Sequence, residues 1–223
     1  LIMDLDGDGV ETMAISEGVN FDLNGDGVKD RTGWVGKDDG LLVADLDNSG
    51  TIDSGRELFG DATIKADGSQ AKHGFEALAD MDSNQDGKIS AVDADFKVLK
   101  IWQDADSDGV TDTGELKSLT EMGVVEINLS HSTGNEKQSG NFITMESTYL
   151  KSDGSVLEIS DVWLRNNSSA GAAQGEEAGV VHIADFNPAT GDALDLRDLL
   201  AAEQGMDLST YLDFDTTSQP GST

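Results

Sequence analysis

The chain has no cysteine, which excludes disulfide bonds and cysteine-based zinc sites. Basic residues are also few: 14 lysines and arginines stand against 44 aspartates and glutamates, for a formal net charge of −30. Nucleic acids and anionic membrane surfaces attract basic proteins, so we expect neither as a partner. No apolar run is long enough to insert into a membrane, and no signal peptide is recognisable. Because Leu1 is not an initiator methionine, we expect a fragment or a processed product of a longer protein.

Motifs of the common hydrolases are absent as well. The three histidines, His73, His131 and His182, lie in three different segments of the chain. There is no G-x-S-x-G or H-E-x-x-H sequence and no glycine loop of the kind that holds phosphate. Two carboxylates for glycoside hydrolysis cannot be singled out among 44 acids. The sequence therefore indicates no conventional hydrolase centre.

What the sequence does contain is a series of aspartate-rich loops, and two of them follow the EF-hand calcium pattern. That pattern places oxygen ligands at positions 1, 3, 5, 7, 9 and 12, with a main-chain carbonyl at position 7 and glycine at position 6. One loop offers Asp82, Asn84, Asp86, Lys88, Ser90 and Asp93, and the other offers Asp104, Asp106, Asp108, Val110, Asp112 and Glu115. Ca²⁺ is a hard cation that takes six to eight oxygens, so we predict an ion in each loop. The alternative is a pair of solvated, aspartate-rich turns.

Three less regular loops precede this pair. Their candidate ligands are Asp4, Asp6, Asp8 and Val10 in the first, Asp22, Asn24, Asp26, Val28 and Asp30 in the second, and Asp45, Asp47, Ser49, Thr51, Asp53 and Glu57 in the third. Glu57 lies one residue beyond position 12 of its loop, so we expect a slightly enlarged loop. The first two loops lack an acid at position 12, and Asp38 and Asp39 are candidates to supply it. Asx-turns without metal are the alternative for these loops.

The predicted fold class is α+β. We expect helices over 75–79, 91–102 and 116–122 around the two EF-hand loops, and an exit helix that begins near Leu58 and Phe59. Strands are predicted at 40–44, 124–129, 142–150 and 156–159, the last two forming a hairpin. Residues 1–165 form the predicted calcium-binding module, 166–179 a linker, and 180–223 a separate C-terminal segment. Because so many carboxylates repel one another, we expect several Ca²⁺ ions to be needed for a compact state.

Residues 1–165 resemble the calcium-dependent self-processing module of the iron-regulated, FrpC-like RTX proteins of Gram-negative bacteria. The motifs that carry the resemblance are MDLDGDGVET (3–12), TGWV (32–35), DDGLLV (38–43), ELFGD (57–61), AKHGF (71–75) and IWQD (101–104). The resemblance implies that calcium folds the module and that an Asp-Pro bond at its N-terminal edge is then cut autocatalytically. The aspartate carboxylate attacks its own carbonyl carbon, the proline nitrogen leaves, and the cyclic anhydride is hydrolysed or opened by a lysine amine to give an isopeptide cross-link.

This sequence contains no Asp-Pro, because Pro188 follows Asn187 and Pro220 follows Gln219. By the resemblance, the scissile bond would lie immediately upstream of Leu1, so the catalytic aspartate is expected outside this chain. The implied partners are the upstream segment of the same polypeptide, lysines of neighbouring proteins, and the type I secretion machinery. The implied location is extracellular or at the cell surface.

The segment from Val181 resembles the C-terminal region of type I-secreted RTX adhesins, although no G-G-x-G-x-D repeat is present. Two other functions stay open at this point. One is a calcium-binding structural or adhesive module without chemistry. The other is an intracellular calcium sensor, which the scattered positions of the six methionines disfavour.

Overall fold

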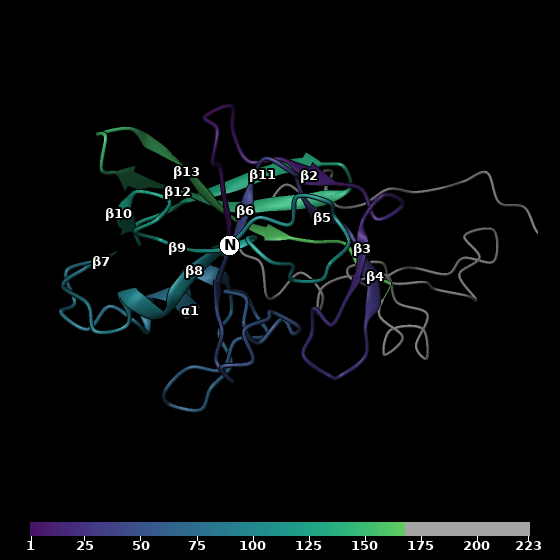
Figure 1. The fold of residues 1–223 in the computed structure, drawn as a ribbon, viewed down its shortest axis with the longest axis horizontal. Coiled ribbons are helices and arrows are strands. Elements are labelled where there is room, and N and C mark those ends of the chain that lie inside the picture. Colours follow the sequence, from purple (N-terminus) through teal and green to yellow (C-terminus); the bar gives the residue numbers. More distant parts are fainter. Residues whose placement is uncertain (168–223) are drawn as a thin grey trace, which may run out of the picture. The chain divides into compact units, whose positions relative to one another are not determined.

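The computed structural model describes residues 1–167 (Figure 1). Within them the chain forms one α-helix, α1 (Gly74–Ala79), one 3-10 turn (Phe96–Val98) and thirteen strands. The strands are β1 (Ile2–Met3), β2 (Thr12–Met13), β3 (Val19–Phe21), β4 (Asp30–Thr32), β5 (Trp34–Val35), β6 (Gly40–Ala44), β7 (Lys88–Ser90), β8 (Leu99–Trp102), β9 (Leu116–Ser118), β10 (Val124–Asn128), β11 (Ser132–Gln138), β12 (Asn141–Lys151) and β13 (Val156–Trp163). None of these residues forms a helix long and apolar enough to cross a membrane.

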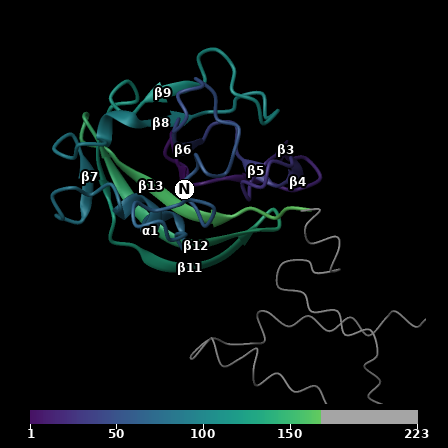
Figure 2. The same cartoon turned by 90° about the horizontal axis from the view of Figure 1, so that it is seen from below.

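A nine-stranded sheet organises residues 1–167. Its order is β7-β10-β12-β13-β1-β6-β8-β9, with β11 also paired to β12, and each of these pairs is antiparallel. The sheet is strongly curled, with the start of the chain inside the curl (Figure 2). In the strand order, the short strand β1 lies in the middle of the sheet, between β13 and β6. Two further pairs, β2–β5 and β3–β4, lie beside the sheet.

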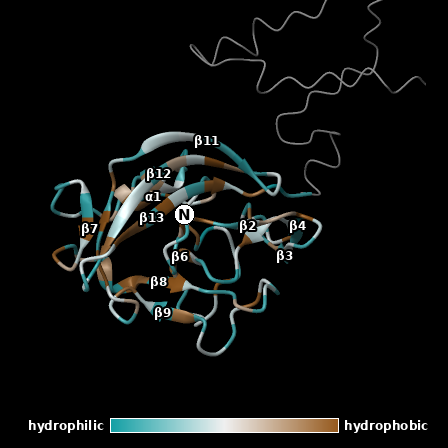
Figure 3. Cartoon of the chain, turned by 90° about the horizontal axis from the view of Figure 1, so that it is seen from above, coloured by the Kyte–Doolittle hydropathy of each residue, from teal (hydrophilic) through white to brown (hydrophobic). Residues whose placement is uncertain are grey.

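Two cores pack on the two faces of the central strands. Strand β6 is buried along its whole length: Leu42 and Ala44 enter the helix-side core, which also contains Phe75 of α1, whereas Leu41 and Val43 enter the tryptophan core around Trp34 and Trp102. This alternation follows from the two-residue period of a strand. Strand β8, which pairs with β6, carries brown segments in Figure 3, whereas the outer strand β11 is white to teal.

The predicted α+β class is wrong, because residues 1–167 are almost entirely β structure around one short helix. The helix predicted over 91–102 is replaced by turns, the 3-10 turn and strand β8. Val92 of the expected apolar face is 71% exposed, while Leu99 and Ile101 enter the helix-side core with the period of a strand. Pairing of β8 with both β6 and β9 overrides the local helical spacing.

The other predicted exit helices are wrong too. Residues 116–118 form β9 instead of starting a helix, and Leu58 makes an isolated bridge to Val43. The loops are therefore not flanked by paired EF-hand helices; only α1 precedes one of them, the 82–93 loop. The prediction of that helix is confirmed, as are the strands at 40–44, 124–129 and the hairpin at 142–159. His73 caps α1 by accepting the Glu76 N–H through Nδ1 at 3.1 Å.

Most of the predicted linker and the whole C-terminal segment lie outside the described residues. The first two linker residues are described, and both touch β4: Asn166 bridges to Thr32, and the Asn167 N–H donates to the Arg31 carbonyl at 2.9 Å. These pairings show that the backbone contacts of the module extend at least to Asn167.

Candidate metal centres

All five aspartate-rich loops fold in the same way around their first aspartate. In each loop a carboxylate oxygen of that aspartate accepts the N–H of the glycine five residues later, at 2.9 to 3.3 Å. Those glycines have positive φ angles between 71° and 106°, which a side chain would strain. The residue two places earlier also has positive φ in every loop: Gly7, Gly25, Asn48, Gln85 and Ser107. The less regular loops thus share the backbone of the two regular ones.

Three of the loops bring carboxylate oxygens together. Within residues 1–167, ligand atoms lie within 4.8 Å of one another in three groups: Asp4, Asp6 and Asp8; Asp45, Asp47 and Glu57; and Asp104, Asp106 and Asp108. The 82–93 loop has Asn84 at the third position, and the Asn84 side-chain nitrogen donates to Asp86 at 2.9 Å. The structure therefore gathers acids at the first, third and fifth loops.

A single carboxylate closes each of the last three loops by accepting two backbone N–H groups. Asp93 accepts from Ser83 at 3.0 Å and from Ser90 at 2.9 Å. Glu115 accepts from Ala105 at 3.1 Å and Asp112 at 3.0 Å. Glu57 accepts from Leu46 at 3.2 Å and Asp53 at 3.1 Å. Glu57 thus takes the same place as Glu115 despite the extra residue in its loop.

Asp39 closes the first loop in the same manner, although it lies far along the chain. Its Oδ1 accepts the Leu5 N–H at 3.2 Å, and its Oδ2 accepts the Glu11 N–H at 2.7 Å. Asp39 is fully buried, whereas its neighbour Asp38 is exposed. Of the two outside acids that the sequence nominates, the structure therefore puts Asp39 at the loop.

The second loop is built into its surroundings differently. The Gly55 N–H donates to the main-chain carbonyl of Asp22 at 2.7 Å, and the Arg56 side chain donates to the Gly25 carbonyl at 3.1 Å. Gly33, at position 12, donates its N–H to the Arg165 carbonyl at 2.7 Å. A guanidinium group beside this loop opposes a cation there, so it is the weakest of the five candidates.

Burial opposes ionisation of three of the loop carboxyls, Asp39, Glu57 and Asp104. It raises the pKa of Asp39 to about 7, even though the Glu11 and Leu5 N–H groups favour the charged form. Burial likewise raises the pKa of Glu57 and of Asp104, against the backbone hydrogen bonds that lower both. A bound cation would reverse this penalty by favouring the charged form of every carboxyl around it.

Two tryptophans connect the last loop to the tryptophan core. Trp34 Nε1 donates to Asp104 Oδ2 at 2.7 Å, and Trp102 Nε1 donates to Glu115 Oε2 at 3.1 Å. The two indoles meet edge to face with centroids 5.6 Å apart. Sequence reasoning assigned these tryptophans no role at a loop. The position of Trp102, two residues before Asp104, is the signal that could have suggested the contact.

Glu11 is a further acid at the first loop that sequence reasoning missed. Its Oε2 is buried and has no hydrogen-bond partner in the described part of the chain. Burial raises its pKa, and the charges of Asp8 and Asp38 raise it further. By contrast, the Val10 carbonyl, a predicted ligand, already accepts the Gln138 side-chain N–H at 3.1 Å. Glu11 is therefore the better candidate to complete the oxygen set of this loop.

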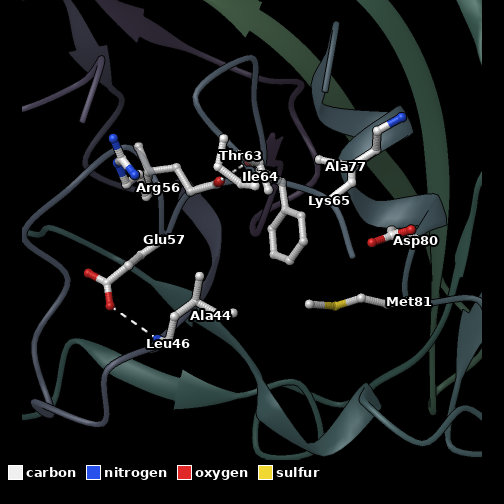
Figure 4. A pocket seen from close by; sticks show the side chains of 12 residues that line it. Ala44, Leu46, Arg56, Glu57, Thr63, Ile64, Lys65, Ala77, Asp80 and Met81 are labelled. Carbon is white, nitrogen blue, oxygen red and sulfur yellow. Dashed lines mark hydrogen bonds between the residues drawn. The ribbon is translucent and has the colours of Figure 1, made fainter. Parts of the chain in front are cut away.

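The start of β1 is enclosed from several sides. The Leu1 nitrogen is fully buried and donates to the Phe59 carbonyl at 2.7 Å, while the Leu1 carbonyl accepts the Leu42 N–H at 3.0 Å. A Cβ on Gly74, at the start of α1, would lie only 2.7 Å from the Leu1 side chain. Phe59 also lines a small pocket between the third loop and α1, where Glu57 turns toward Leu46 (Figure 4).

Residues 1–165 match the sequence model of the SPM domain. The chain belongs to the SPM domain family. It is also 46% identical over 167 residues to the iron-regulated protein FrpA of Neisseria meningitidis serogroup C. The match covers 74% of this chain and 15% of FrpA, so the chain spans only a small part of that relative. The family resemblance drawn from the sequence motifs is confirmed for residues 1–165, and the segment from Val181 lies outside that match.

The oxygen donors of this SPM domain suit a hard cation. Carboxylate, amide, hydroxyl and carbonyl oxygens are the ligands that Ca²⁺ prefers. At the fourth loop the Lys88 ammonium pairs with Glu126 at 2.8 Å. The residues present therefore fit calcium, most completely at the first, third and fifth loops.

Proposed function

We propose that this SPM domain is folded by calcium and promotes cleavage of an Asp-Pro bond placed immediately before Leu1. The observation that carries the proposal is the connection of the first loop to β1. Asp4 directly follows β1, and Asp39, which closes the loop, directly precedes β6. Those two strands pair with Ile2 opposite Leu41 and Met3 opposite Gly40. An ion held between Asp4 and Asp39 would therefore clamp β1 against β6.

Clamping β1 fixes the position of whatever precedes it. One end of the strand would be held at the ion, and the other end is held by the Phe59 carbonyl and the Leu42 N–H. The peptide nitrogen of Leu1 is buried at that second end. A charged amine is costly there, whereas a neutral peptide N–H that donates to Phe59 is not. The site therefore suits a chain that continues upstream of Leu1.

The chemistry that we propose for the upstream bond is intramolecular acyl transfer. The side-chain carboxylate of the aspartate bonds to its own carbonyl carbon, and the bond from that carbon to the proline nitrogen breaks. Holding the two groups in an attacking geometry replaces a bimolecular encounter and supplies a high effective molarity. The cyclic anhydride is then hydrolysed by water or opened by a lysine amine to give an Asp–Lys isopeptide bond.

The test is a chain with Asp-Pro restored before Leu1 and a marker segment upstream. In millimolar calcium we expect a clipped band, together with higher-mass adducts when a lysine-rich acceptor is present. Asp39→Asn should slow the cut strongly at the same calcium concentration, because it weakens the loop that holds β1. A chain that folds in calcium and stays intact would instead support the alternative, a calcium-binding structural or adhesive module.

We further propose that the parent protein is a secreted RTX toxin or adhesin exported by type I secretion. The net charge of −30, the absence of cysteine and the five loops suit a chain that stays unfolded until it meets extracellular calcium. Lysines of neighbouring proteins are the proposed acceptors for the cross-link.

A further inference from the structure

A buried acid, Asp161, lies beside the start of β1. Strands β1 and β13 are antiparallel with Ile2 opposite Ser160 and Met3 opposite Ile159, and extending this register by one residue places Leu1 opposite Asp161. Opposed residues of an antiparallel pair share a face of the sheet. Leu1, Met3 and Ile159 all belong to the helix-side core, so Asp161 lies on that same face next to Leu1.

One carboxylate oxygen of Asp161 lacks a hydrogen-bond donor within the described residues. The side chain is only 3% exposed, and its buried Oδ2 has no hydrogen-bond partner among residues 1–167. The known contact of this residue uses its main chain, whose carbonyl accepts the Thr144 hydroxyl at 3.2 Å. Leaving a buried carboxylate oxygen unpaired destabilises the folded protein. Such a cost is consistent with a group whose partner arrives only with the substrate.

The negative charge of Asp161 affects the pKa of the Leu1 amino group. Burial lowers the pKa of the Leu1 amino group, and the negative charge of Asp161 is the influence that raises it. The nitrogen of the preceding residue would lie one residue further along the strand, about 3.5 Å away. Under the proposed function this is the proline nitrogen that leaves, and it would lie one residue beyond the position that the strand register places opposite Asp161.

We propose that Asp161 is a catalytic residue of the cleavage, whose Oδ2 accepts an N–H of the proline nitrogen as that nitrogen leaves and becomes protonated. The inference rests on the proposed function. As the bond between the aspartyl carbon and the proline nitrogen breaks, the side-chain oxygen bonds to that carbon. The nitrogen takes one proton from water to become an amine and a second to become an ammonium ion, and the hydroxide left behind is consumed when the anhydride is hydrolysed to two carboxylates. Asp161 pairs with that ion and keeps it from attacking the anhydride.

The first test uses the full chain with Asp-Pro restored before Leu1, at saturating calcium. Asp161→Asn keeps the shape of the side chain and removes its charge, and the cleavage rate should fall about 100-fold, as when one preorganised electrostatic partner is deleted elsewhere. Glu158→Gln is the matched control on the same strand, because among the described residues its side chain accepts a hydrogen bond from the Ser160 hydroxyl alone. Calcium affinity, circular dichroism and tryptophan fluorescence should be unchanged in both variants.

A second test needs no cleavage and uses the chain as it stands. NMR titration of the Leu1 amino group should give a lower pKa in Asp161→Asn than in the wild type, while Glu158→Gln leaves it unchanged. If Asp161→Asn does not fold in calcium, Asp161→Ser takes both measurements. An Asp161→Asn chain that folds and cuts at the wild-type rate, or an unmoved Leu1 pKa, overturns the role of Asp161 and leaves the proposed function standing. A wild-type chain that never cuts overturns both.

Discussion

The bond from Trp34 to Asp104 gives the sharpest test of how the last loop is joined to the core. Asp104 is fully buried and uses both oxygens: Oδ2 accepts Trp34 Nε1 at 2.7 Å and the Gly109 N–H at 2.9 Å, and Oδ1 accepts the Asp108 N–H at 3.2 Å. Asp104→Asn keeps one acceptor oxygen and turns an NH₂ group toward another donor. The matched control is Asp106→Asn, which removes one loop charge at an exposed position.

The magnitude follows from what each change leaves unpaired. Both variants lose one negative charge near the ion, so that loss cancels between them. Asp104→Asn additionally leaves a buried donor without an acceptor, at about 1–3 kcal/mol, and weakens the remaining charge-assisted bonds. We therefore expect Asp104→Asn to be less stable than Asp106→Asn by about 3 kcal/mol, which is roughly 6–12 °C in Tm for a domain of this size.

The assay is thermal unfolding in saturating calcium, followed by tryptophan fluorescence and circular dichroism. Trp34→Phe removes the indole N–H and, combined with Asp104→Asn, should give a double-mutant coupling of about 1–2 kcal/mol. Equal melting temperatures for Asp104→Asn and Asp106→Asn would refute the claim that the buried bond to Trp34 matters to stability.

The remaining predictions concern the first loop and two glycines. Asp39→Asn should weaken calcium binding at the first loop by at least about 10-fold, measured by calorimetry against the wild type, because a charged ligand group is lost; unchanged binding would exclude Asp39 from the site. In chelator, the residual structure should decrease as pH rises from about 4 to 7. The reason is that the pKa of the Asp39 carboxyl is about 7 when it is buried and about 4 when the chain is unfolded, so ionisation in this range favours the unfolded state. Asp39→Asn should remove that part of the pH dependence. Gly55→Ala should lower the free energy of unfolding by about 3 kcal/mol or more, because the new Cβ would lie 1.8 Å from the Leu23 carbonyl oxygen. Gly60→Ala should change it by no more than about 0.5 kcal/mol, because no atom lies within 4 Å of the new Cβ. Similar losses of stability in both variants would contradict the packing at Gly55.

Local sequence patterns were sufficient for the loops and for several strands. The shared Asp-x-Asp/Asn-x-Asp/Ser-Gly pattern is a local device, in which the first carboxylate binds the glycine N–H five residues later. Alternating apolar residues identified the strand at 124–129, and the 142–159 hairpin was identifiable because its two strands are neighbours in the sequence.

Long-range partners account for what the sequence did not reveal. The 91–102 segment has helical spacing, yet it becomes a strand because β6, more than fifty residues earlier, offers a fully buried pairing edge. The acid that closes the first loop comes from Asp39, and spacing alone could not choose between it and Asp38. The bonds from Trp34 and Trp102 to loop carboxylates, and the central place of β1, also depend on how distant strands assemble.

The most direct test of the account is a calcium titration of the purified chain, followed by circular dichroism and by size-exclusion chromatography in parallel. In excess chelator the carboxylates repel one another and the buried acids resist ionisation, so the chain should be expanded and should melt without a cooperative transition. Added calcium should produce the compact sheet in one step shared by both measurements. The same compact, cooperatively melting structure in excess chelator would contradict the claim that ions among the loops hold this fold together.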